Sequence, residues 1–163
     1  MSLRTRLIGA TAAWATCAAL AAGGGGGRSG PDASEMHSQV GYKQAVAAIE
    51  AQRWPEAVEL LKKHVWRYDR DADGHNWLAF AYRKTGQLDD AFKHYKRALT
   101  IDPSHLGAHE YIGEAYLMAG KMPEAEQHLK RLAALCQGRC EQYRDLEKAI
   151  AQRRASASVT VGK

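Results

Sequence analysis

The chain has 163 residues, of which 25% are charged and 45% are hydrophobic, a length and balance typical of one globular domain. The formal net charge is +5 at pH 7, and Arg4 and Arg6 at the extreme N-terminus supply two of these charges. The remaining charge, 5 − 2 = +3, is too small to indicate a nucleic-acid-binding protein.

The first segment, residues 1–21, has the pattern of a secretory signal peptide. The basic start MSLRTR precedes the apolar run LIGATAAWATCAALAA, and Ala19-Leu20-Ala21 fits the small-x-small cleavage pattern. We therefore expect an exported protein, located in the bacterial periplasm after cleavage. Two alternatives stay open. The run is short and alanine-rich for a retained membrane anchor, and the residues before Cys17 match a lipidation motif poorly.

The next segment, residues 22–36, contains five consecutive glycines. Such a run cannot bury a core and has maximal backbone freedom. A glycine-rich phosphate-binding loop would need a preceding strand and a following Lys-Ser/Thr pair, and neither is present in the sequence. We interpret this segment as a flexible linker.

From residue 37 onward, apolar residues recur at helical spacing and the sequence repeats itself every 34 residues. The segments RWPEAVELL, QLDDAFKHY and KMPEAEQHL are three versions of one pattern. The sets that keep the interval are Ala57/Ala91/Ala125, Ala45/Ala79/Gly113, Tyr82/Tyr116, Gly86/Gly120 and Leu61/Tyr95/Leu129. Several positions repeating together make this signal specific.

A 34-residue period of paired helices resembles the tetratricopeptide repeat (TPR) family. The resemblance covers residues 37–139, with repeats at 38–71, 72–105 and 106–139, and the second repeat matches best. It implies an all-α fold, a TPR solenoid of three helix-turn-helix pairs. Small residues at the repeated positions allow the two helices of a pair to approach closely.

The end of such an array needs a cap, because one repeat cannot bury its apolar face alone. We expect a capping helix at residues 140–153, where Tyr143, Leu146 and Ile150 share one face. Residues 154–163 show no periodicity, and we expect a disordered tail there.

The resemblance also implies a concave groove, lined by the first helices, that holds an extended peptide or a partner helix. The protein would then be a non-catalytic adaptor or scaffold that binds another protein. We expect no cofactor, no metal, no nucleic acid and no direct membrane binding after cleavage of the signal, and self-association stays open. The residues expected to face the groove are Tyr42, Val46, Ile49, Asn76, Trp77, Phe80, Arg83, Lys84, Glu110, Tyr111, Glu114, Leu117 and Met118. Family members that grip a C-terminal carboxylate use Lys, Asn and Arg here, so Glu110 and Glu114 argue against that clamp.

The stretch DRDADG, residues 69–74, resembles the start of an EF-hand calcium loop. The twelfth residue counted from Asp69 is Phe80, where such a loop needs a bidentate glutamate. We interpret the stretch as an inter-repeat turn whose aspartates cap the following helix.

Cys136 and Cys140 bracket the sequence QGR. Residues four apart on an unbroken helix keep their Cβ atoms roughly 5–6 Å apart, whereas a disulfide needs about 3.5–4.5 Å. The bond therefore requires a break in the helix, which Gly138 offers. We predict a structural disulfide that fixes the capping helix. A thiol-redox or copper-handling protein that uses the same cysteines is the alternative, as is an accessory subunit of an envelope enzyme complex.

His105 and His109 stand four residues apart and would share a helix face, as metal-binding histidines do. No third ligand is visible, so we expect exposed histidines at the start of a helix. The sequence has no serine elbow, Walker loop or dinucleotide fingerprint, and nothing in it argues for catalysis.

Overall fold

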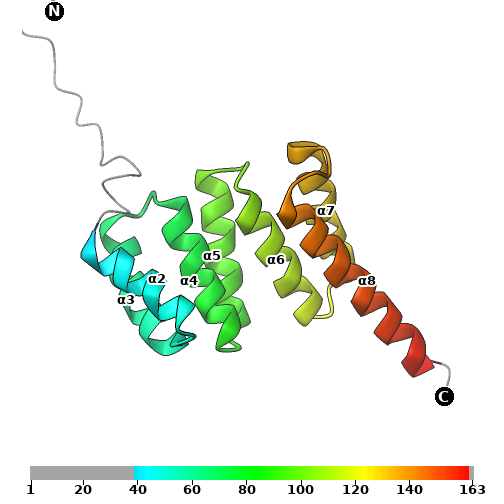
Figure 1. Cartoon of the computed structure of the whole chain (residues 1–163), viewed down its shortest axis with the longest axis horizontal. Coiled ribbons are helices and arrows are strands. Elements are labelled where there is room, and N and C mark those ends of the chain that lie inside the picture. Colours follow the sequence, from blue (N-terminus) through cyan, green and yellow to red (C-terminus); the bar gives the residue numbers. More distant parts are fainter. Residues whose placement is uncertain (1–38, 162–163) are drawn as a thin grey trace, which may run out of the picture. The chain divides into compact units, whose positions relative to one another are not determined.

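The structure is a computed structural model that describes residues 39–161. In this part the chain forms seven α-helices and no strand (Figure 1), which confirms the predicted all-α class. The helices are α2 (Val40–Glu50), α3 (Trp54–Arg67), α4 (Ala72–Lys84), α5 (Leu88–Ile101), α6 (Leu106–Met118), α7 (Met122–Cys136) and α8 (Glu141–Val161). None of these helices combines the length and the hydropathy needed to cross a membrane. The segments predicted as a signal peptide (1–21) and a linker (22–36) lie outside the described residues.

The two helices of each pair are joined by a turn that requires a left-handed residue. Gly86 and Gly120 have φ values of 79° and 72°, which glycine adopts without a Cβ penalty. In the first pair Gln52 takes this place with φ 56°. Pro55 and Pro123 lie in the first turns of α3 and α7, where a missing N–H costs no hydrogen bond.

Small residues at the repeated positions form the centre of the helix packing. Those that are fully buried are Ala45, Ala57, Ala79, Ala91 and Ala125. Gly113 stands where the first two repeats have alanine, and a Cβ there would lie 2.6 Å from Cδ2 of Leu146 on α8. The glycine thus leaves room for Leu146, which completes the last core cluster together with Leu132 and Ile150.

Helix α8 packs against α6 and α7 and closes the last helix pair, as a capping helix should (Figure 1). It continues to Val161, beyond the end expected at residue 153, so residues 154–161 are helical rather than part of a disordered tail. No glycine or proline interrupts this sequence, and Arg154 Nη2 forms an ion pair with Glu126 Oε1 of α7 at 2.7 Å. Helix propensity and this contact extend the helix past its last apolar position.

Candidate functional site

Aromatic side chains from three helices, α3, α4 and α6, pack against one another. Trp77 and Phe80 of α4 pack edge to face with their ring centres 5.7 Å apart. Tyr111 of α6 lies 5.0 Å from Phe80, and Trp54 of α3 lies 5.9 Å from it. All four rings are partly buried. We call Trp54, Trp77, Phe80 and Tyr111 the aromatic cluster. Rings of this kind combine a large apolar area with few rotatable bonds and serve as binding anchors.

Two cations of α4 lie over the aromatic cluster. The guanidinium carbon of Arg83 is 5.1 Å from the Phe80 ring centre and 5.6 Å from that of Tyr111. Arg83 Nη1 also forms an ion pair with Glu114 Oε2 at 2.7 Å. Lys84 Nζ is 5.2 Å from the Phe80 ring centre. Arg83 is 7% exposed and is paired with Glu114, although its Nε has no hydrogen-bond partner among the described residues. Lys84 is exposed and accessible to a ligand.

Glu110 precedes Glu114 by one helical turn but lacks a comparable partner. It is 8% exposed, and no group within residues 39–161 donates a hydrogen bond to its carboxyl or forms an ion pair with it. Burial, followed by the nearby carboxylates of Glu114 and Asp145, raises the pKa of Glu110 to about 8, although Arg83 acts in the opposite direction. The group is therefore mostly protonated at neutral pH.

The other residues expected to face the groove differ in accessibility. Four of them are buried: Tyr42, Ile49, Asn76 and Leu117. Val46 is half-buried, and Met118 at the end of α6 is 54% exposed. The structure thus concentrates the accessible, chemically distinctive side chains on α4 and α6. A role of these residues in partner binding stays a prediction.

Two histidine pairs that we did not predict join the helices within the second and third repeats. His75 Nδ1 lies 2.9 Å from His94 Nδ1, and His109 Nδ1 lies 2.9 Å from His128 Nδ1. In each pair one ring nitrogen donates its proton to the other. Burial lowers the pKa of all four rings, to about 4 for His94 and His128. The 34-residue interval was the available signal, because it separates His75 from His109 and His94 from His128.

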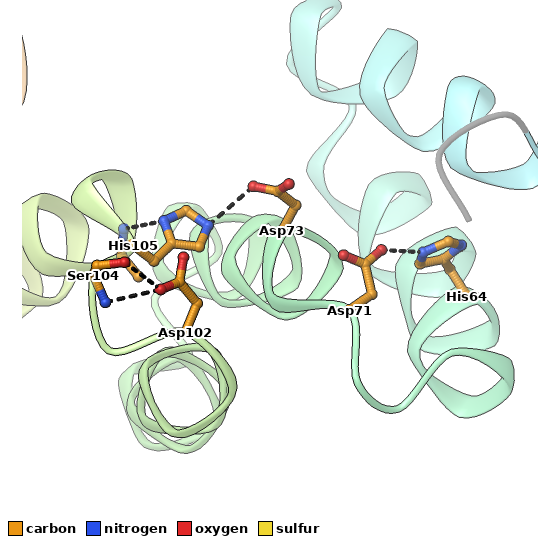
Figure 2. Close-up of polar contacts among 7 residues, drawn as sticks. His64, Asp71, Asp73, Asp102, Ser104 and His105 are labelled. Carbon is orange, nitrogen blue, oxygen red and sulfur yellow. Dashed lines mark hydrogen bonds and ion pairs between the residues drawn. The ribbon is translucent and has the colours of Figure 1, made fainter. Parts of the chain in front are cut away.

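The expectation that His105 and His109 are exposed is wrong. His109 is 6% exposed because it packs against His128. The His105 ring accepts a hydrogen bond from the Ala108 N–H at 3.1 Å, which caps α6, and its Nε2 lies 3.0 Å from Asp73 Oδ1 (Figure 2). The two rings therefore face different partners. Among the described residues, no three His, Cys, Asp or Glu side chains are arranged to hold a metal ion.

The DRDADG stretch forms the connection between the first two helix pairs, as expected, but Asp71 does not cap α4 with its side chain. Asp71 is 2% exposed, and its Oδ2 lies 2.7 Å from His64 Nε2 near the end of α3 (Figure 2). Gly74 makes room for this pair, because a Cβ there would lie 2.9 Å from both side chains. Phe80 lies inside α4, so the segment cannot form an EF-hand loop.

Cys136 and Cys140 lie at the turn between α7 and α8. The helix breaks there because Gln137 and Gly138 have φ values of 54° and 70°. The two Cα atoms are 5.8 Å apart and the sulfur atoms are in contact, a geometry that permits a disulfide. The required break in the helix is thus present, and it begins one residue before the predicted glycine.

Sequence comparison identifies the family. Two sequence models, each described as a tetratricopeptide repeat, match residues 42–105 and 82–152. The chain belongs to the tetratricopeptide repeat family. The two TPR matches together extend across the three helix pairs and into α8, and the fold is a TPR solenoid, as predicted. A search of curated proteins found no significant match.

Solved TPR structures share this fold. The TPR2B domain of yeast Sti1, in a pHsp70 complex, matches with a TM-score of 0.64 and 18% identity over 71% of this chain and 94% of that one. The Yersinia enterocolitica type III secretion chaperone SycD, with a YopD peptide, matches with a TM-score of 0.62 and 17% identity. The match covers 74% of this chain and 91% of that one. The Sgt2 TPR domain from Aspergillus fumigatus matches with a TM-score of 0.65 and 15% identity. The match covers 82% of this chain and 89% of that one. At these identities the likeness is one of fold alone.

Proposed function

We propose that this TPR protein is a non-catalytic adaptor that binds a segment of a partner protein across the aromatic cluster and Lys84. The observation that carries the proposal is the cluster itself, in which four partly exposed rings lie beside an exposed cation. Aromatic and cationic side chains in this arrangement are typical anchors of protein interfaces. The TPR2B domain of Sti1 was solved in a pHsp70 complex, and the chaperone SycD was solved with a peptide of YopD, which supports a peptide segment as the ligand.

The partner segment is expected to differ from one that presents a C-terminal carboxylate. Arg83 is already paired with Glu114, and Glu110 adds a second carboxyl group on the same helix. An incoming carboxylate would meet like charge at α6 and would displace Arg83 from its partner. The ligand therefore engages the cluster through apolar and cationic side chains, or through its backbone.

A differential capture experiment tests the binding face. The full chain would be crosslinked in its native cell fraction and compared with a Trp77→Ala/Lys84→Glu variant. Trp66→Ala/Lys63→Glu is the matched control, because it makes the same chemical changes on α3, where Trp66 is 87% exposed. We expect a partner to be lost from the first variant and retained by the control. A partner retained equally by both variants contradicts the proposal.

The proposed site of action is outside the cytoplasm, in the bacterial periplasm, after removal of residues 1–21. The basic and apolar start of the sequence supports this proposal. Cell fractionation followed by N-terminal sequencing tests it. A mature protein that begins after Ala21 in the periplasmic fraction is the expected result, and a cytoplasmic protein with an intact N-terminus contradicts it.

We also propose that Cys136 and Cys140 form a structural disulfide that fixes the turn between α7 and α8. The contact between the sulfur atoms supports this, and disulfides persist in oxidising compartments. A thiol titration of the native mature protein should find no reactive thiol. Two rapidly reacting thiols would instead favour the thiol-redox or copper-handling alternative.

A further inference from the structure

Four carboxyl groups lie together where α8 crosses α6. They belong to Glu110, Glu114, Glu141 and Asp145, and the charges of the last three raise the pKa of Glu110. We call this set the acidic corner. The cation that acts on it, Arg83, is bound to Glu114 at 2.7 Å. Within residues 39–161 no ion pair neutralises Glu110, Glu141 or Asp145. The corner therefore has more carboxyl groups than cations to pair with them.

Glu110 is the unusual member of the acidic corner. It is more than nine-tenths buried, with 8% of its surface exposed, and it has no hydrogen-bond donor among the described residues. Its carboxyl oxygens are nevertheless not among the fully covered unpartnered polar atoms of residues 39–161. They therefore keep a small area that solvent can reach.

The acidic corner adjoins the aromatic cluster. Tyr111 follows Glu110 in the sequence, and burial together with the charges of Glu110 and Glu114 raises its pKa. Arg83 lies over the Tyr111 ring and binds Glu114, so it joins the two features physically. A single extended segment or helix can therefore contact both.

We propose that the acidic corner is a pocket for a lysine or arginine side chain of the bound partner segment, next to an apolar side chain held by the aromatic cluster. This inference rests on the proposed adaptor function. The cation supplies the donor that Glu110 lacks, and the carboxylates of Glu141 and Asp145 add long-range attraction. A metal ion is a less suitable occupant, because these carboxyl groups are not arranged as a metal site in the described structure.

Binding of a cation at Glu110 should release a proton, which a glutamate with a purely structural role would not do. Free Glu110 is mostly protonated at neutral pH, with Glu114 on its own helix, Arg83 on α4, and Asp145 and Glu141 on α8 as its charged neighbours. A nearby ammonium or guanidinium group favours the ionised carboxylate. The carboxyl therefore releases its proton to solvent when the partner's cation binds, and up to one proton per complex leaves the protein.

The test begins with random peptides displayed on phage and selected against the full chain. Wild-type protein is compared with Glu110→Gln, with Glu110→Lys and with the control Glu50→Gln, which changes an exposed carboxylate on α2. Wild type and the control should enrich peptides with a lysine or arginine beside an apolar residue. Glu110→Lys places a cation among the carboxyl groups of the corner, where it can pair with them, and this variant should fold. It should no longer enrich peptides that contain lysine or arginine.

Calorimetry on one enriched peptide then measures affinity and proton release. Replacing its basic residue by norleucine should weaken binding to wild type by about tenfold or more, and Glu110→Gln should weaken binding of the original peptide similarly. Titration in two buffers of different ionisation enthalpy should show proton release for wild type and none for Glu110→Gln.

The outcomes separate the two proposals. If no peptide is enriched by any form of the protein, the adaptor function itself fails, and the pocket with it. If peptides are enriched through the aromatic cluster without a basic preference, or with a preference that Glu110→Gln retains, the adaptor function stands and the cation pocket is overturned.

Discussion

Two buried carboxyl groups, one directly before α4 and one within α6, have contrasting surroundings. Asp71, between the first and second repeats, is 2% exposed and lies 2.7 Å from His64 Nε2. Glu110, between the third repeat and the cap, is 8% exposed and has no partner within residues 39–161. The first carboxyl group is paired within the chain, whereas the second has no partner among the described residues.

This contrast distinguishes two uses of a buried charge. A paired carboxylate fixes one arrangement of the helices around it, because breaking the pair leaves an uncompensated charge. An unpaired carboxyl contributes nothing of this kind and lowers the stability of the free protein. Such sites are tolerated where function requires them. Removing the two carboxyl groups should therefore change stability in opposite directions.

The largest expected effect follows the loss of the paired carboxylate. Asp71→Ala leaves the His64 ring buried without the acceptor at its Nε2, near the junction of the first two repeats. Leaving a buried donor without its acceptor costs about 1–3 kcal/mol, and more where a charge takes part in the bond. Urea denaturation followed by circular dichroism should show a much lower midpoint. Hydrogen exchange should show the greatest loss of protection in α2 and α3.

Asp71→Asn is the matched control, because asparagine keeps the shape and one acceptor oxygen but removes the charge. It should lose about 1–2 kcal/mol, less than the alanine variant, since only the charge-assisted part of the bond is removed. Equal losses in the two variants would mean that packing around Gly74, rather than the pair, holds this junction together.

The second effect has the opposite sign. The pKa of Glu110 is about 8 in the folded protein against an ordinary value of 4.5, so the unfolded chain releases this proton at lower pH than the folded chain. The stability of the wild type therefore falls as pH rises from 4.5 to 8, through this group. Glu110→Gln removes that loss. The full shift corresponds to about 4.8 kcal/mol, and we expect about 2 kcal/mol of extra stability above pH 8 because the carboxyl oxygens are not fully shielded from solvent.

Urea midpoints of wild type and Glu110→Gln, measured across this pH range, test the linkage. The difference between the two proteins should be small below pH 4.5 and should reach its full size above pH 8. Other titrating groups occur in both proteins and cancel in the difference. Glu50→Gln should show no such trend, because Glu50 is exposed. A Glu110→Gln variant that is less stable at every pH would show that this carboxyl has a structural partner.

The contrast between the two sites also marks what the sequence could predict. The 34-residue period was enough to predict the helix pairs, and the resemblance to TPR proteins placed Trp77, Phe80 and Tyr111 on the expected groove. Periodicity assigns a residue to a face, but it does not say which neighbour that face meets. The pairing of Asp71 with His64 depends on a contact between repeats, so local capping rules gave the wrong role. The burial of Arg83 and Glu110 likewise depends on the packing of α6 against α4 and α8.

The length of α8 was missed for a different reason. Its apolar pattern ends at Ile150, so amphipathicity gives no signal beyond that point. The helix persists because its residues favour helix and because Arg154 contacts Glu126. A contact between residues 28 apart in the sequence cannot be read from a helical period.

The smallest expected effect concerns the two histidine pairs. They are intermediate between the paired Asp71 and the unpaired Glu110, because each pair keeps its hydrogen bond only while both rings are neutral. The pKa values of His94 and His128 are about 4 in the folded protein, against an ordinary 6.5. The unfolded chain therefore binds these protons first as pH falls, and stability is lost between about pH 6.5 and 4. Each pair should account for about 1–2 kcal/mol of this acid loss, allowing for the partial exposure of the rings.

The test replaces histidine with leucine, because the first repeat has Leu60 at the position equivalent to His94, 34 residues earlier. A His75→Ala/His94→Leu variant replaces one pair with apolar side chains, and His109→Ala/His128→Leu does the same in the third repeat. Each variant should lose less stability than the wild type between pH 7 and pH 5, and the two variants should behave alike because their geometry repeats. An acid loss that both variants retain in full would place the acid-sensitive groups elsewhere. An acid loss relieved by only one variant would show that equal 2.9 Å contacts in the two repeats have unequal energetic weight.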